Sequence, residues 1–342
     1  MGSEVTLKEI AEELGISAMT VSRAINNRSN VDSKTKERIL KKAREMGYTP
    51  NHIAKSLVSR KSFTIGVVVP EIAHSFFAEA IQGIEEVTFK DNYQLILTHS
   101  AEREDREQYA LQTLQSKRVD GILISPAETV KDYSFYQRIV ESNTSLVFFD
   151  RCVGGIGASC VSVDDQAGAY KITSHLIDHG YKKIAHLYGP LNLSISRQRL
   201  EGYKKALKEN YITVEENLIV ESGFHEKGGY EAMNKLLEAQ KTSPPRAVFA
   251  VNDPAAFGAM EAIHNHGFSI PDDIAIVGFS DDIRAKLLTP SLTTVKQPAE
   301  KIGMIAAQKL IREIENDTEH MEKINLPTSI VIRESCGCSY NN

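Results

Sequence analysis

The chain has 342 residues, of which 42% are hydrophobic and 25% are charged, and its formal net charge at pH 7 is −5. That length exceeds what one hydrophobic core usually organises, so two or three domains are expected. No apolar run approaches the roughly 18 residues of a membrane span, and no charged segment precedes a short apolar run with a cleavage site. We therefore expect a cytoplasmic protein without membrane contact.

Charge is distributed unevenly along the chain. Residues 1–62 hold twelve Lys and Arg against seven Asp and Glu, a net charge of +5, whereas residues 63–342 hold 28 against 38, a net charge of −10. A basic N-terminal module on an acidic body is the distribution expected when one end of a protein binds a polyanion. Nucleic acid is the polyanion that this pattern favours.

The first predicted elements are two closely spaced helices. The segment Thr6–Glu9 has the S/T-x-x-E spacing of a capping box, and apolar residues then recur at helical spacing as far as Leu14. Gly15 can end this helix in a left-handed conformation, and Ser17 can cap a second helix, with an apolar stripe of Val21, Ala24 and Ile25. Such a pair, with almost no connection between its helices, predicts a helix-turn-helix. A third helix is expected from Asp32 or Ser33 to Gly47, with Ile39, Leu40, Ala43 and Met46 facing inward.

The second helix carries the residues that could contact bases. Its apolar stripe turns the opposite face outward, with Ala18, Met19, Ser22, Arg23 and Asn26 on it. The first turn of such a helix contacts base edges in the major groove. Arg23 can make a bidentate contact to guanine, while Ala18 and Met19 offer apolar surface to a thymine methyl group. An exposed helix with a solvated arginine is the structural alternative.

Three spaced blocks of the N-terminal segment match a known protein family, namely Val5–Ala11, Ser17–Asn26 and Gly47–Asn51. Together they resemble the LacI/GalR family of transcription regulators. The resemblance implies a base-reading role for Ala18, Met19 and Arg23. It also implies phosphate contacts, which suit hydroxyl and amide groups at helix ends, for Thr6, Ser17, Thr20, Ser22, Asn26, Thr35 and Tyr48.

Residues 49–62 are predicted to be a hinge between residues 1–48 and the rest of the chain. The stretch from Asn51 to Val58 is too short to form a stable helix in water. The resemblance implies that it folds into a helix on operator DNA, where Leu57 wedges into the minor groove and Ala54 and Lys55 also contact that groove. An ordinary interdomain linker is the alternative.

From residue 63 onward, short apolar runs alternate with segments of helical period, which is typical of βα units and parallel sheets. The runs are Ile65–Val69, Gln94–Leu97, Gly121–Ile124, Leu146–Phe149, Ile184–Leu187, Ala247–Val251 and Ile274–Val277. The family resemblance extends over this part and implies a periplasmic-binding-protein-like α/β body, residues 63–338, that binds an effector and dimerises. We expect lobe 1 at residues 63–163 and 292–322 and lobe 2 at residues 164–291 and 323–338, with chain crossings near 163, 291 and 323.

Ligands of open α/β sheets bind beyond the carboxyl ends of the strands, where this chain has a polar set. Carboxylates, amides and guanidinium groups suit a hydroxyl-rich ligand, and phenylalanines can stack on the apolar face of a sugar. The predicted effector-binding residues are Phe76, Phe77, Ser125, Asp150, Arg151, Arg199, Phe224, Asn252, Asp253, Ser280 and Asp281. Pairing of Arg199 with an aspartate when no ligand is bound is an alternative. Several relatives have Asp where this chain has Ser280, so the usual carboxylate contact is lost or shifted here.

The sequence gives little support for catalytic or metal-binding sites. The chain lacks the P-loop, HExxH and GxSxG motifs, so we expect neither an enzyme nor a cofactor. The four cysteines are too few and too late in the chain for a disulfide framework or a zinc site with CxxC pairs, so reduced thiols are expected. His264 and His266 lie at a predicted helix end, where histidines complement the helix dipole, so no metal is expected there.

These features predict a transcription regulator, more specifically a repressor. Because one helix-turn-helix reads only a few base pairs, we expect a homodimer on a near-palindromic operator in double-stranded DNA. A sugar-like effector is expected to control affinity, and a phosphoprotein corepressor remains an alternative regulator. The alternative functions are a sugar-binding protein and a sugar-modifying enzyme with no DNA role.

Overall fold

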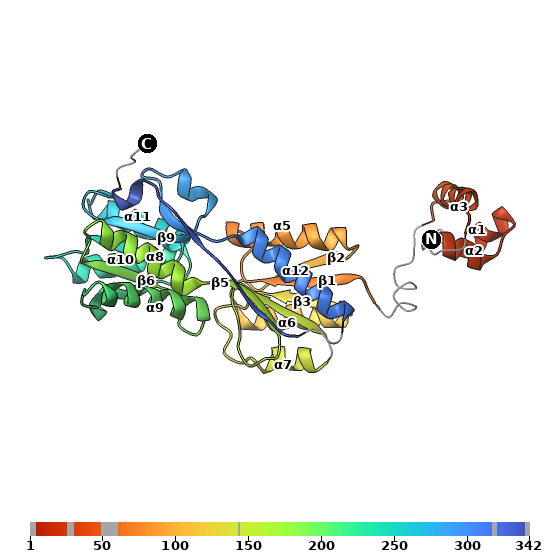
Figure 1. Cartoon of the computed structure of the whole chain (residues 1–342), viewed down its shortest axis with the longest axis horizontal. Helices are drawn as coiled ribbons and strands as arrows, with labels where there is room; N and C mark the ends of the chain where they lie inside the picture. Colours follow the sequence, from red (N-terminus) through yellow and green to blue (C-terminus); the bar gives the residue numbers. More distant parts are fainter. Residues whose placement is uncertain (1–4, 26–30, 49–60, 143, 317–319, 339–342) are drawn as a thin grey trace. The chain divides into compact units, whose positions relative to one another are not determined.

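The computed structural model describes residues 5–25, 31–48, 61–142, 144–316 and 320–338 (Figure 1). These residues belong to two compact units, residues 1–62 and residues 63–342. In the described part of the chain, no helix is both long enough and apolar enough to cross a membrane.

The N-terminal unit contains the three expected helices: α1 (Leu7–Leu14), α2 (Ala18–Ile25) and α3 (Ser33–Glu45). Thr6 and Glu9 form the predicted capping box, in which each side chain bonds the other residue's backbone amide. Gly15 ends α1 at a φ of 63°, a conformation that glycine adopts at little cost. The helices enclose a small apolar core, made of Ile10, Ala11, Val21, Ala24, Ile39 and Ala43.

The second unit consists of two lobes, each built on one six-stranded sheet. In lobe 1 the strand order is β11-β5-β4-β3-β1-β2, and all pairs are parallel. Its elements are β1 (Thr64–Val69), α5 (Ser75–Lys90), β2 (Gln94–His99), α6 (Glu104–Ser116), β3 (Gly121–Ile124), α7 (Ser134–Glu141), β4 (Ser145–Phe149), β5 (Ser159–Val163), α12 (Ala299–Glu315) and β11 (Lys323–Leu326).

In lobe 2 the strand order is β12-β10-β9-β8-β6-β7, and only the β10–β12 pair is antiparallel. Its elements are α8 (Asp165–Asp178), β6 (Ile184–Tyr188), α9 (Ser194–Glu209), η1 (Glu216–Leu218), β7 (Ile219–Glu221), α10 (Glu226–Ala239), β8 (Ala247–Ala250), α11 (Asp253–Asn265), β9 (Ala275–Ser280), η2 (Ile283–Lys286), β10 (Thr293–Lys296), β12 (Ser329–Val331) and η3 (Glu334–Cys336). The central strands are buried along their length, as expected for a parallel sheet covered on both faces.

The chain crosses between the lobes three times, and two crossings lie later than the sequence predicts. β10 pairs with β9 of lobe 2, so the crossing expected near residue 291 follows Lys296. β11 pairs with β5 of lobe 1, so the crossing expected near residue 323 follows Leu326. Both strands have only four residues, and the local sequence pattern does not reveal which of the two sheets each strand joins.

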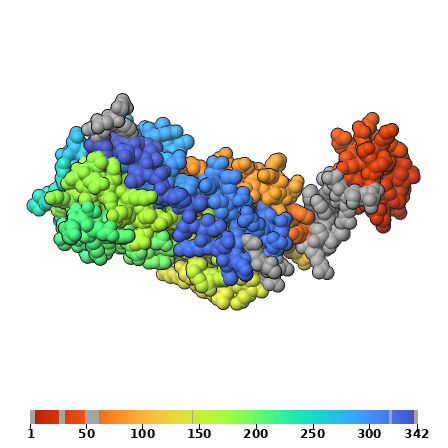
Figure 2. Space-filling view, viewed as in Figure 1, coloured from red at the N-terminus to blue at the C-terminus, as the bar shows by residue number. Residues whose placement is uncertain are grey.

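Helix α12 returns late in the chain to pack beside α5, as Figure 1 shows. The two backbones approach so closely that a Cβ atom on Gly83 would overlap the carbonyl oxygen of Glu300, and one on Gly303 would overlap that of Ala80. The C-terminal part of the chain, blue in Figure 2, covers parts of both lobes.

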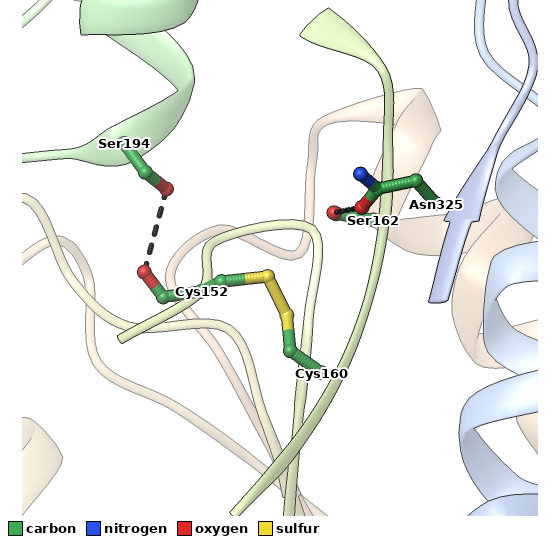
Figure 3. The surroundings of a disulfide bond; sticks show 5 residues. All are labelled: Cys152, Cys160, Ser162, Ser194 and Asn325. Carbon is green, nitrogen blue, oxygen red and sulfur yellow. Dashed lines mark hydrogen bonds between the residues drawn. A yellow bond between two sulfur atoms is a disulfide. The ribbon is translucent and has the colours of Figure 1, made fainter. Parts of the chain in front are cut away.

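The prediction of reduced thiols is wrong for one pair of cysteines. Cys152 and Cys160 form a disulfide bond in lobe 1 (Figure 3). The segment between them folds back on itself and brings the two Cα atoms to 5.8 Å, a separation that a disulfide can span. Cys336 and Cys338 are not disulfide-bonded.

Candidate functional site

The exposed face of α2 carries the three residues that the sequence predicts to read bases. Val21 and Ala24 are buried against α1 and α3, which fixes the rotation of the helix. Ala18, Met19 and Arg23 are exposed as a result, and 63% of the Met19 surface is accessible. A methionine so exposed at the start of a short helix has no role in packing this unit. The face is free to make contacts with another molecule.

The residues predicted to contact phosphates gather at helix starts. Thr6 caps α1, and the Ser17 hydroxyl accepts from the Thr20 amide at 3.1 Å in the first turn of α2. Thr35 lies in the first turn of α3, where its amide donates to the capping Asp32. Helix N-termini attract anions because their amides point outward with a partial positive charge. Of the other predicted contacts, Ser22 and Tyr48 are half-buried, whereas Asn26, Ala54, Lys55 and Leu57 lie outside the described residues.

A cavity of about 450 Å³, including the solvent at its mouth, lies between the two lobes. Its lining comes from the ends of strands β4, β8, β9 and β10 and from α5, α9 and their loops. The lining residues are Glu71, His74, Phe76, Phe77, Glu102, Asp150, Arg151, Ile195, Arg199, Phe224, His225, Asn252, Ser280 and Gln297. Eight of the eleven predicted effector residues are among them.

The other three predicted residues lie outside this lining. Ser125 is fully buried. Asp253 is also fully buried and accepts hydrogen bonds from the Thr294 hydroxyl and the Asp282 amide, so it holds loops of lobe 2 together. Asp281 forms an ion pair with Arg333 at 2.6 Å and lines a separate surface hollow. No local sequence signal separates such structural carboxylates from cavity residues, because all follow the carboxyl end of a strand.

Two buried ion pairs hold the guanidinium groups of the cavity. Arg199 bonds Asp165 at 2.8 Å, donates to the Val251 carbonyl at 2.7 Å and stacks over the Phe279 ring. This is the pairing with an aspartate that the sequence left open as an alternative. Arg151 makes a bidentate pair with Glu102, at 2.8 and 2.9 Å. Because both cations are neutralised within the protein, the cavity does not attract anions strongly.

Buried groups in the cavity have shifted pKa values. Burial raises the pKa of Asp150, although Arg151 and Arg199 oppose the effect. Burial also lowers the pKa of His74 to about 4, so its imidazole is neutral at pH 7. Burial would raise the pKa of Glu102, but the adjacent Arg151 outweighs it and lowers that pKa. The cavity therefore combines a neutral imidazole with two carboxyl groups whose pKa values are shifted in opposite directions, up for Asp150 and down for Glu102.

The backbone is strained at the ends of two strands that border the cavity. Asp150, after β4, has a φ of 62°, and Ser280 and Asp281, at the end of β9, have φ values of 136° and 62°. Non-glycine residues adopt positive φ at some energetic cost, and such strain concentrates at ligand sites. Ser280 is buried, and its hydroxyl has no hydrogen-bond partner among the described residues. That hydroxyl is available to a ligand.

Sequence reasoning missed six lining residues: Glu71, His74, Glu102, Ile195, His225 and Gln297. His74 had a local signal, because it precedes an amphipathic segment and its Nδ1 caps α5 by accepting from the Phe76 amide. Glu102 had none, since its partner Arg151 is 49 residues away. Gln297 follows β10, a short strand that the sequence pattern places in lobe 1 but that pairs with β9 of lobe 2.

Hydrogen bonds also join the two lobes around the cavity. The Ser75 hydroxyl of lobe 1 donates to Asp282 of lobe 2 at 2.9 Å. From lobe 2, Ser194 at the start of α9 donates to the carbonyl of Cys152 at 3.3 Å, as Figure 3 shows beside the disulfide. These hydrogen bonds help to set the angle between the lobes. A ligand that contacts both lobes can therefore change that angle.

Comparison with known proteins gives a consistent result for both units. Residues 6–51 match the model of bacterial regulatory proteins of the lacI family, and residues 173–336 match that of a periplasmic binding protein-like domain. The chain is 32% identical over 332 residues to catabolite control protein A of Priestia megaterium, covering 97% of this chain and 99% of that protein. It belongs to the LacI family.

Other members of the family agree in sequence and in structure. The ribose operon repressor of Haemophilus influenzae is 36% identical, over 96% of this chain and 98% of its own. The lac repressor dimer bound to operator and the anti-inducer ONPF superposes with a TM-score of 0.85 at 26% identity, covering 98% of this chain and 99% of that one. This LacI-family chain is thus a DNA-binding transcription regulator, and its relatives are regulators rather than enzymes.

Proposed function

We propose that the protein is a repressor that binds a near-palindromic operator as a homodimer in the cytoplasm, and that a hydroxyl-rich small molecule controls its affinity. A sugar or sugar derivative is the class of effector that fits best. The observation that carries this proposal is the chemistry of the interlobe cavity. Its lining combines aromatic surface, buried acids, a neutral imidazole and the Ser280 hydroxyl, which has no hydrogen-bond partner among the described residues.

The cavity residues divide the work of holding such a ligand. Phe76, Phe77 and Phe224 offer flat apolar surface to the face of a sugar ring. Asp150 and the Ser280 hydroxyl face the same space and bond ligand hydroxyl groups. The name of the relative from H. influenzae, a ribose operon repressor, supports a sugar as the effector class.

The α2 face supplies the DNA contacts in this proposal. Arg23 contacts guanine in the major groove, while Ala18 and Met19 provide apolar contacts within each half-site. The hinge leucine, Leu57, wedges into the minor groove at the operator centre. Two such units are needed because one reads too few base pairs, and the operator-bound dimer of the lac repressor supports this stoichiometry.

Coupling between ligand and DNA follows from the lobe geometry. A ligand that bonds Asp150 of lobe 1 and Ser280 of lobe 2 favours one angle between the lobes. In a dimer that angle sets the spacing of the two hinges, so ligand and operator binding are linked reciprocally by about 1 to 3 kcal/mol.

The effector class is tested by a thermal-shift screen of the purified full chain against sugars, sugar acids, sugar phosphates and nucleosides, because a ligand of the native state raises the melting temperature. Calorimetric titration of each hit then measures its affinity. We expect Ser280→Ala to weaken binding by about fivefold to tenfold, as one lost hydrogen bond does.

The matched control is Ser116→Ala, at the exposed end of α6. It should bind the ligand as the wild type does. A hit whose affinity is unchanged by Ser280→Ala would contradict the assignment of the cavity. No hit in the whole panel would contradict the sugar-like effector and favour the protein corepressor.

A further inference from the structure

Two cysteines and two histidines meet at the outer end of lobe 2, away from the interlobe cavity. Cys336 and Cys338 come from the C-terminal segment, and His175 and His179 from the last turn of α8 and its end. The Cys338 sulfur lies 3.2 Å from Nε2 of His175, 3.0 Å from Nε2 of His179 and 2.9 Å from the Cys336 sulfur. Ligand atoms of His175, Cys336 and Cys338 all lie within 4.8 Å of one another.

Local structure explains why these four side chains converge. His175 and His179 are four residues apart, so they share one face of the helix, and their ring centroids are 4.4 Å apart. Gly337, between the cysteines, has a φ of 77°, a conformation that glycine adopts without strain and that turns the chain tightly. The Tyr181 hydroxyl donates to the Cys336 carbonyl at 3.2 Å and holds that turn against the lobe.

We propose that Cys336, Cys338, His175 and His179 form a structural zinc site. Two thiolates and two imidazoles are a set that favours tetrahedral zinc, and a closed set of four protein ligands is typical of structural rather than catalytic zinc. The histidine spacing, H-x₃-H, lies within the range common in such sites, while the C-x-C spacing is tighter than usual. The left-handed Gly337 makes the tighter spacing workable.

The surroundings of the site fit metal binding. Nδ1 of His179 lies 2.7 Å from the His175 carbonyl oxygen, so the ring can donate there and leave Nε2 free for a metal. The Thr293 hydroxyl lies 3.2 Å from the Cys336 sulfur, to which it donates. With zinc bonds of about 2.3 Å to sulfur and about 2.0 Å to nitrogen, the ligand atoms of a tetrahedral site lie roughly 3.3 to 3.8 Å apart. The three distances to the Cys338 sulfur need to lengthen by less than about 1 Å to admit the ion. His179 also needs to turn toward the other ligands, because the ligand atoms that lie within 4.8 Å of one another are those of His175, Cys336 and Cys338.

Such a site would join two segments that are distant in the sequence. It links α8, the first helix of lobe 2, to the end of the described chain, 163 residues later for the pair His175 and Cys338. The last short strand and η3 have only three residues each, so they offer little packing of their own. Zinc would anchor this C-terminal segment on lobe 2.

The test uses the full chain without a polyhistidine tag, purified with reductant and without chelator. Elemental analysis should find about one zinc per chain. Replacement by Co²⁺ should give the visible absorption bands of a tetrahedral site and a sulfur-to-cobalt charge-transfer band in the near ultraviolet. Chelation should lower the melting temperature, and added zinc should restore it.

Variants identify the ligands. Cys338→Ser and His179→Ala should each lower zinc affinity by more than about tenfold and weaken the cobalt bands. Matched controls are His264→Ala, which removes a histidine from the end of another lobe 2 helix, and Cys160→Ser, which removes a cysteine from lobe 1; both should keep one zinc. Circular dichroism establishes that each variant is folded.

Three results would overturn the proposal. One is a folded, reduced chain that binds neither zinc nor cobalt. Another is metal binding that survives Cys338→Ser and His179→Ala together. The last is a Cys336–Cys338 disulfide that persists in reductant, because oxidised sulfurs cannot ligate zinc. It is detected as a mass two hydrogens lower in the proteolytic peptide that holds both cysteines, which separates it from the Cys152–Cys160 bond.

Discussion

Substituting Glu102 by Gln removes one partner of a buried ion pair and leaves the other charge in place. The side chains of Arg151 and Glu102 are only 5% and 9% exposed, and their two hydrogen bonds measure 2.8 and 2.9 Å. Glutamine is similar in shape, but it cannot neutralise the guanidinium. Removing one member of a buried pair costs about 3 to 5 kcal/mol, and we expect the lower part of that range because Asp150 lies 3.9 Å from Arg151.

The assay is urea-induced unfolding at pH 7, followed by circular dichroism, for the wild type and Glu102→Gln. The control is Asp105→Asn, which breaks an exposed pair of similar geometry with Arg103 and should leave stability unchanged within error. Because Arg151 lowers the pKa of Glu102, the stability that this ion pair contributes is fully present above the usual glutamate pKa. It is lost as the pH falls through the lowered pKa of Glu102 in the folded protein. A loss below about 1 kcal/mol at pH 7 would refute the reasoning.

Three further predictions concern DNA recognition and pH. Arg23→Ala should relax base preference at one position of each half-site, at a cost of about 1 to 3 kcal/mol, measured by binding to a set of single-base operator variants; uniform weakening across the set would contradict base reading. Leu57→Ala should weaken operator binding more than binding to random DNA, because the wedge acts on a deformable centre; equal losses would exclude that role. Burial raises the pKa of Asp253 to about 7, so the folded state binds an extra proton and stability falls as pH rises from about 4 to 7. Asp253→Asn should remove this slope, up to roughly 4 kcal/mol over three pH units, and an unchanged slope in unfolding midpoints would contradict the assignment.

Much of the N-terminal unit could be predicted because its signals are local. The capping box of Thr6 and Glu9 spans four residues, and Gly15 ends α1 one residue beyond its last turn. The stripe of Val21 and Ala24 fixes which face of α2 is exposed. Each of these features is decided by neighbours in the sequence, so pattern and structure agree.

The cavity was predictable only in part. Asp150, Asn252 and Ser280 follow strands whose apolar runs are evident in the sequence, so their place at the sheet edge could be inferred. Glu102 could not be, because it enters the site through its pairing with Arg151, 49 residues away. Asp253 shows the limit from the other side, since this strand-end carboxylate accepts a hydrogen bond from Thr294 within lobe 2 and is not among the residues that line the cavity.

The cysteines show the same limit. Cys152 and Cys160 are separated by eight positions, and only the fold of the intervening segment brings them together. Cys336 and Cys338 meet His175 because the chain returns to α8 after 163 residues. Counting and spacing of cysteines alone predicted free thiols for all four, because these contacts depend on tertiary structure.

The central claim is that a ligand in the interlobe cavity changes operator affinity. The direct measurement is fluorescence anisotropy of a labelled duplex, selected by the protein from a random-sequence library, titrated with and without a saturating ligand from the thermal screen. The account predicts a change in Kd of about fivefold to 150-fold, which Ser280→Ala shifts to higher ligand concentration. Identical Kd values with and without a ligand bound in the cavity would contradict it.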